Sequence, residues 1–77
     1  MALQHVTIEI PEKILLAEKT DVETFGHEIR MLAAVKLFEM GRLSSGRAAE
    51  LAGMPRVEFL LNLIAIRYFL LPLNSTT

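Results

Sequence analysis

The sequence predicts a mainly α-helical protein in which a short N-terminal β-strand precedes a helical bundle that contains a helix-turn-helix-like pair. Three observations predict this fold class: apolar and polar residues alternate over residues 4–10, apolar residues recur at helical spacing over residues 21–40, and two further helical segments meet at a glycine within residues 45–68. The 77 residues form a single domain, 1–77, of which 52% are hydrophobic and 22% charged. A monomer of this size cannot bury so much apolar surface, so we expect a homodimer.

The first element is the predicted strand over residues 4–10. Val6, Ile8 and Ile10 share one face and polar residues share the other, which is typical of a half-buried strand that ends at Pro11. Because a single strand leaves its backbone groups unpaired, we expect it to pair with the C-terminal apolar run or with the same strand of a second chain. Val6 and Ile8 are therefore candidates for a dimer or partner interface.

A short helix over residues 12–18 and a core helix over residues 21–40 follow. Thr20-Asp21-Val22-Glu23 fits a capping box, in which the Thr20 hydroxyl and the Glu23 side chain satisfy free amides at the helix start. Gly41 supplies the left-handed stop. Apolar residues line one face of the core helix at Phe25, Ile29, Leu32, Ala33, Leu37 and Met40. Val22, Met31, Val35 and Phe38 widen this stripe beyond what one neighbouring helix would cover.

The pair of helices over residues 45–68 carries the most information about function. Ser44 or Ser45 can cap its first helix, and Pro55 begins the second, which runs to about Tyr68. A helix-turn-helix needs a small residue, a turn glycine four positions later and an apolar residue about six beyond that, and Ala49, Gly53 and Phe59 have this spacing. Ordinary αα-hairpins also contain such a pattern, so it predicts the tight helix pair better than it predicts DNA contact. Residues 69–77 form an apolar, then polar, tail.

Charge is distributed in a way that favours contact between this pair and double-stranded DNA. Residues 1–40 carry four basic and seven acidic side chains, whereas residues 41–77 carry four arginines and two glutamates. Arginine is well suited to phosphate contact. The candidate DNA-binding residues are Arg42, Ser45, Arg47 and Arg56.

The second helix is, however, more apolar than a base-reading helix, because Val57, Leu60 and Leu61 occupy early positions. The alternative function is therefore a protein-protein interaction module with no DNA role. Its dimer or partner interface would comprise Val6, Ile8, Leu60, Leu61, Ile64, Phe69 and Leu71. A ribbon-helix-helix arrangement, in which His5, Thr7 and Glu9 would face bases, is less favoured because that segment is acidic.

Several other functions find no support in the residues. The sequence has no cysteine and two histidines far apart, so we expect neither a metal site nor a cofactor. No catalytic set can be assembled, which predicts that the protein is not an enzyme. The apolar run from Phe59 to Leu73 is interrupted by Asn62, Arg67 and Pro72, so we expect no membrane span. The N-terminus has no secretory signal pattern, which favours a cytoplasmic location.

The segments TIEIPE and LFEMGRLSSGRAAELAGMPRVEFL resemble the small prokaryotic proteins of uncharacterised protein family UPF0175, over about residues 6–68. The resemblance implies an antitoxin-like helix-turn-helix protein that binds a cognate toxin or other protein partner and its own operator. Members of that family usually continue with a glycine turn, a strand and an acidic tail, whereas this sequence has an apolar run over residues 69–73. We therefore expect Phe69 and Leu71 to serve self-association.

Overall fold

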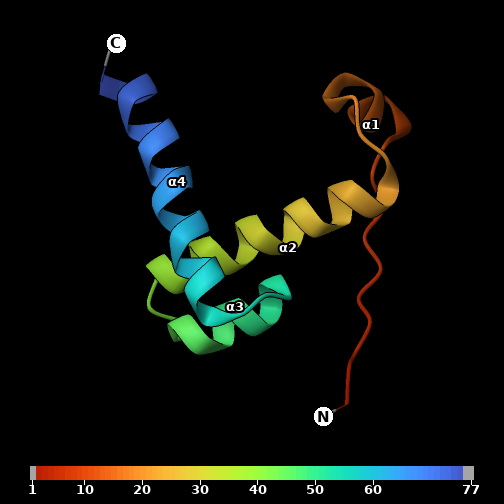
Figure 1. The fold of residues 1–77 in the computed structure, drawn as a ribbon. Coiled ribbons are helices and arrows are strands. Elements are labelled where there is room, and N and C mark those ends of the chain that lie inside the picture. The colour runs from red at the N-terminus through yellow and green to blue at the C-terminus, as the bar shows by residue number, and fades with distance from the viewer. Residues whose placement is uncertain (1, 76–77) are drawn as a thin grey trace.

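The computed structural model describes the backbone of residues 2–75 and the side chains of residues 2–67, and this part of the chain forms four α-helices (Figure 1). The helices are α1 (Glu12–Glu18), α2 (Val22–Glu39), α3 (Ser45–Ala52) and α4 (Arg56–Ser75). α3 packs against both α2 and α4, while α1 lies at the opposite end of α2 (Figure 1). The packed part of the molecule is therefore built mainly from the second half of the sequence.

The predicted N-terminal β-strand is wrong, because residues 2–75 contain no strand. Residues 2–10, called the arm below, run without secondary structure along one side of α2 to the start of α1. Alternating side chains alone do not make a strand, since a strand also needs a neighbour to accept and donate its backbone hydrogen bonds. None of the backbone hydrogen bonds outside the helices of residues 2–75 involves the arm. The C-terminal apolar run expected as a partner is instead part of α4.

The cap of α2 also differs from the prediction by one residue. Asp21, rather than Thr20, is the N-cap: its Oδ1 accepts a hydrogen bond from the Thr24 amide at 2.8 Å, and its Oδ2 accepts one from the Thr24 hydroxyl at 3.2 Å. The Thr20 hydroxyl reaches only the Asp21 carbonyl, at 3.5 Å. Both residue types are good caps, and the sequence does not distinguish between two that are adjacent. The hydrogen bonds from Thr24 lower the pKa of the Asp21 carboxyl from its ordinary value of 3.8.

Two glycines end α2 and α3 in the same way. Gly41 and Gly53 both have φ of +75°, which an L side chain rarely adopts. The following amides reach back to helix carbonyls, from Arg42 to Leu37 at 2.9 Å and from Met54 to Ala49 at 3.0 Å. These turns redirect the chain so that α3 can contact both α2 and α4.

The hydrophobic core lies where α2, α3 and α4 meet. Phe59 is the largest side chain with no exposed surface, and its ring meets that of Phe38 edge to face, with centroids 6.0 Å apart. Small side chains on α3 allow the three helices to approach closely. The buried residues are Ala34, Val35, Ala48, Ala49, Ala52, Phe59 and Leu63. By contrast, no side chain between residues 2 and 33 is buried.

Candidate nucleic-acid interface

The N-terminal end of α3 is held by Ser44. Its Oγ accepts a hydrogen bond from the Arg47 amide at 3.2 Å, which identifies Ser44, rather than Ser45, as the N-cap. The Ser45 hydroxyl is therefore free for another partner. Arg47 lies in the first turn of α3, and Arg42 lies in the preceding loop; both side chains are exposed.

Arg56 connects the start of α4 with the start of α3. Its Nε donates a hydrogen bond to Ser45 Oγ at 2.7 Å. Of the predicted DNA-binding residues, Arg56 and Ser45 are thus in direct contact, although they are 11 positions apart in sequence. Nη1 and Nη2 of Arg56 carry the guanidinium donors that this bond does not use.

Arg42 and Arg47 also lie near the N-terminal end of α3, but neither takes part in the hydrogen bond between Arg56 and Ser45. Ala48, Ala49 and Ala52 define the buried face of α3, and helical periodicity places Arg47 on the solvent side. No hydrogen bond or ion pair within the described side chains joins Arg42 or Arg47 to Arg56. The arginines therefore surround one end of α3 rather than forming a single cluster.

Acidic side chains weaken the positive field around these arginines. Glu50 lies three residues after Arg47 on α3, and Glu58 lies two residues after Arg56 on α4. Both carboxylates are exposed, as are the arginines. Exposed charges interact weakly across water, so the glutamates reduce the attraction for an anion without abolishing it.

The three residues of the predicted helix-turn-helix spacing lie where α3 and α4 meet. Ala49 and Phe59 are buried, and Gly53 ends α3 with positive φ. Arg30 of α2 completes this turn: its Nε donates to the Leu51 carbonyl at 2.8 Å, and its Nη2 lies 3.3 Å from the position that a Cβ on Gly53 would occupy. Sequence reasoning missed this positioning residue, because Arg30 is 21 positions from Leu51 and the contact depends on how α2 packs.

The outward face of α4 is apolar. Val57, Leu61 and Ile64 recur at helical spacing away from the buried Phe59 and Leu63, and they are 70%, 62% and 56% exposed. We call these three residues the α4 stripe. Large apolar side chains grouped on one helix face suit protein contact better than contact with base edges.

Two neighbours of the α4 stripe are less suited to contact with a partner. Leu60, which the sequence places at the interface, is partly buried and packs against the core instead. Asn62 donates its side-chain amide to the Glu58 carbonyl at 2.9 Å within its own helix, so that donor is already used. Phe69 and Leu71 lie in α4, but their side chains are outside the described residues.

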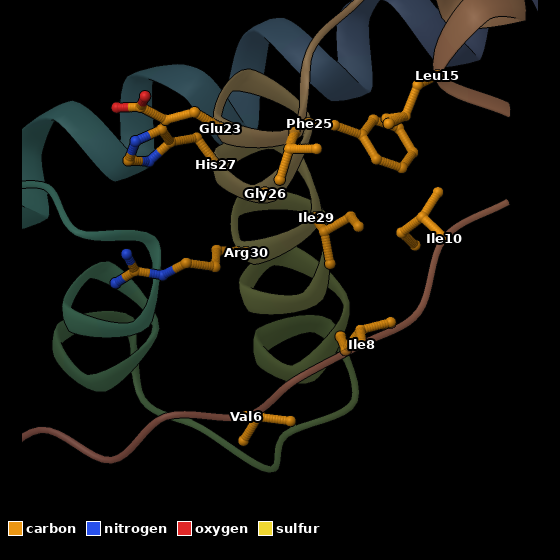
Figure 2. A pocket seen from close by; sticks show the side chains of 11 residues that line it. Val6, Ile8, Ile10, Leu15, Glu23, Phe25, Gly26, His27, Ile29 and Arg30 are labelled. Atoms are coloured by element: carbon orange, nitrogen blue, oxygen red, sulfur yellow. The ribbon is translucent and has the colours of Figure 1, made fainter. Parts of the chain in front are cut away.

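The arm and α2 enclose an open apolar groove of about 470 Å³. Figure 2 shows Ile8 and Ile10 of the arm lying towards Phe25 and Ile29 of α2. Val6 and Ile8, both predicted at an interface, line this groove and are nevertheless 83% and 58% exposed. The full apolar lining is Val6, Ile8, Ile10, Leu15, Val22, Phe25 and Ile29.

Metal-binding and membrane-spanning features are absent from the part of the chain that the structure describes. Among these residues, no three His, Cys, Asp or Glu side chains come together where they could share a metal ion. Across the same residues, none of the helices combines the length and the hydropathy that a bilayer span requires.

The fold and these surfaces define a class: a small helical protein with a tightly packed helix pair, exposed arginines at one end of the pair and apolar surfaces elsewhere. The chain belongs to Uncharacterised protein family (UPF0175), whose family model matches residues 1–67. That match covers α1, α2, α3 and the first part of α4. No curated protein and no solved structure matches the chain.

Proposed function

We propose that this protein is an antitoxin-like transcriptional regulator that dimerises and binds double-stranded DNA weakly through α3 and α4, used as a helix-turn-helix. The main support for the proposal is the hydrogen bond from Arg56 to Ser45, because it joins the first residue of α4 to the first residue of α3. In a helix-turn-helix, the first helix contacts the DNA backbone and the N-terminal residues of the second helix enter the major groove. Arg56 would be the residue nearest the bases, and Arg47 and Arg42 would contact phosphates.

Electrostatics support binding that is weak and sensitive to salt. If Arg42, Arg47 and Arg56 of each protomer met one phosphate, a dimer would neutralise about six, giving a slope of log K against log salt near −5. Glu50 and Glu58 lie close to these arginines in sequence and would reduce the attraction. DNA binding would thus use the positive end of the helix pair together with the symmetry of two copies.

Titration of a fluorescent duplex from upstream of the coding region, at several salt concentrations, tests this proposal. We expect binding that weakens with salt, and Arg47→Ala should make the slope shallower by about 2 for a dimer, at roughly 0.9 per phosphate. Arg67→Ala is the matched control, because it removes the same charge at a residue whose Nε lies 3.2 Å from the Glu39 carboxylate. Absence of binding at low salt would overturn the proposal, as would equal losses from both substitutions.

The α4 stripe supports a second candidate, a protein-interaction module without a DNA role. An exposed row at positions 57, 61 and 64 can be covered by the apolar face of a partner helix. The partner would be a toxin chain or another protein encoded beside this one. Co-expression with the product of the neighbouring reading frame, followed by size-exclusion chromatography, should give a complex that Leu61→Glu disrupts and Arg67→Ala preserves. A complex unaffected by Leu61→Glu would contradict this use of α4.

Both candidates are binding functions, and we propose no enzymatic activity. The regulatory candidate also requires that the protein share a compartment with DNA, so we propose a cytoplasmic location. Fractionation of cells that express the tagged protein would test the location directly.

A further inference from the structure

We propose that the groove between the arm and α2 is the homodimer interface, and that the arm of a second copy covers it with the two arms antiparallel about a two-fold axis at Thr7. This inference takes one thing from the proposed function, namely that the protein forms a dimer. It concerns a surface that is separate from the arginines of α3 and α4.

The first reason is that the chain alone exposes too much surface. Its accessible area is 6545 Å², whereas a folded monomer of 8.6 kDa exposes about 4,700 Å². Its radius of gyration is 14.0 Å, against about 11.5 Å for a compact domain of this length. A stable interface of standard size buries about 800 Å² on each partner, which the excess area can supply.

The second reason is where the uncovered apolar side chains lie. The buried core belongs to α2, α3 and α4 from Ala34 onward, while residues 2–33 have no buried side chain. That first part nevertheless holds the entire apolar lining of the groove. The groove is open to solvent, so a second arm can add its own apolar side chains to the same space.

The third reason is that the arm is complementary to itself when reversed. Val6, Ile8 and Ile10 line the groove, whereas the polar residues that alternate with them do not. A two-fold axis at Thr7 places position 5 of one copy opposite position 9 of the other, so that a histidine faces a glutamate twice. The same axis places Val6 opposite Ile8 on the groove side. An imidazole that can donate a hydrogen bond to a carboxylate, and paired apolar side chains, are favourable pairs between neighbouring extended segments.

Cysteine crosslinking of the full chain tests the arrangement directly, because the sequence contains no cysteine. Thr7→Cys should form a covalent dimer under mild oxidation, since a residue on a two-fold axis meets its own copy. His5→Cys and Glu9→Cys should not crosslink alone, because each residue would lie about 13 Å from its copy, four extended residues at about 3.3 Å each. Disulfides need Cα atoms within about 7 Å. Mixing the His5→Cys and Glu9→Cys chains should restore the covalent dimer.

Charge reversal tests the same register without a covalent bond. His5→Glu alone should weaken the dimer about tenfold in sedimentation, because a carboxylate would then face the Glu9 carboxylate of the other copy in both cross-chain pairs. Combining His5→Glu with Glu9→Lys in one chain should restore wild-type dimerisation, because a carboxylate at position 5 would then face an ammonium group at position 9 of the other copy. Unchanged dimerisation of the His5→Glu variant would overturn the proposed register.

A chain that stays monomeric at tens of micromolar would overturn the interface. So would crosslinking of Leu61→Cys without crosslinking of Thr7→Cys, which would assign the dimer to the α4 stripe. DNA titration is independent of these results. Loss of DNA binding with an intact Thr7→Cys crosslink would contradict the proposed function alone, and DNA binding without the crosslink would contradict this inference alone.

Discussion

Arg30 of α2 donates a hydrogen bond from Nε to the carbonyl of Leu51 near the end of α3, at 2.8 Å. Carbonyls in the last turn of a helix lack partners within the helix, so a cation that satisfies one of them is favourable. The same guanidinium lies against Gly53, with Nη2 3.3 Å from the position of an added Cβ. Arg30 therefore links the orientation of α2 to the turn that precedes α4.

Replacing Arg30 should loosen this turn. We expect Arg30→Ala to lower the free energy of unfolding by about 1 kcal/mol, because a hydrogen bond that involves an exposed charged group makes a modest net contribution. Arg30→Lys removes the same Nε donor while keeping the charge, so it should lose nearly as much stability in urea unfolding. Full stability of the lysine variant would show that charge, rather than the hydrogen bond, matters.

Gly53→Ala should destabilise the protein. Its φ of +75° disfavours a side chain, and the new Cβ would press on Arg30, so we expect a loss of about 1–2 kcal/mol in thermal or urea unfolding. Gly46→Ala is the matched control: Gly46 lies in the first turn of α3, and nothing lies within 4 Å of its added Cβ. That control should be neutral or stabilising by up to about 1 kcal/mol. Equal effects of the two substitutions would contradict the role of positive φ.

Phe59 should dominate the stability of the helix pair. It has no exposed surface, so Phe59→Ala should cost about 3–5 kcal/mol, a large share of the stability of a small domain. The more conservative variants Phe59→Leu and Phe38→Leu permit a double-mutant cycle in which the free energy of unfolding is measured in urea. We expect a coupling of about 0.5–1.5 kcal/mol from the edge-to-face contact between the two rings. Additive losses would show that the rings contribute only through separate burial.

The cap of α2 should make stability depend on acid pH. The pKa of the Asp21 carboxyl is lowered in the folded chain by its hydrogen bonds to Thr24, relative to the ordinary value of 3.8. A lowered pKa contributes stability above the unfolded value, and that contribution is lost as pH falls through the folded value. Asp21→Asn keeps a capping oxygen but removes the titration, so the stability difference from wild type should shrink as pH falls below about 4. A difference that stays constant from pH 6 to pH 3 would contradict this cause.

Local features of the fold can be predicted from the sequence. Glycine at positions 41 and 53 predicts the ends of two helices, because the positive φ of these turns favours a residue without a Cβ. The predicted cap of α2 is one residue too early, since Thr and Asp are both good caps and only the hydrogen bond from Thr24 shows which of the two adjacent residues is used. The spacing around Gly53 predicts a tight helix pair, and Ala49 and Phe59 of that pattern are buried.

Contacts between distant segments cannot be predicted in this way. The sequence does not show that Arg56 reaches Ser45, or that Leu60 turns towards the core while Leu61 faces solvent, because both depend on the angle at which α4 crosses α3. The predicted strand is wrong for a related reason: alternation specifies which side chains share a face, but pairing requires another segment at the right place.

The order of residues was enough to specify that four segments are helical, that glycines end two of them, and that charge is separated between the two halves, since these depend on residues that are neighbours along the chain. It did not specify that α4 continues past Tyr68 to Ser75. The assembled helices were needed to place the arginines around one end of α3, to bring Arg30 to the turn, and to lay the arm over an open groove on α2. These relationships join residues that are far apart in sequence. Their energy comes from packing and hydrogen bonds that form only when the helices are assembled.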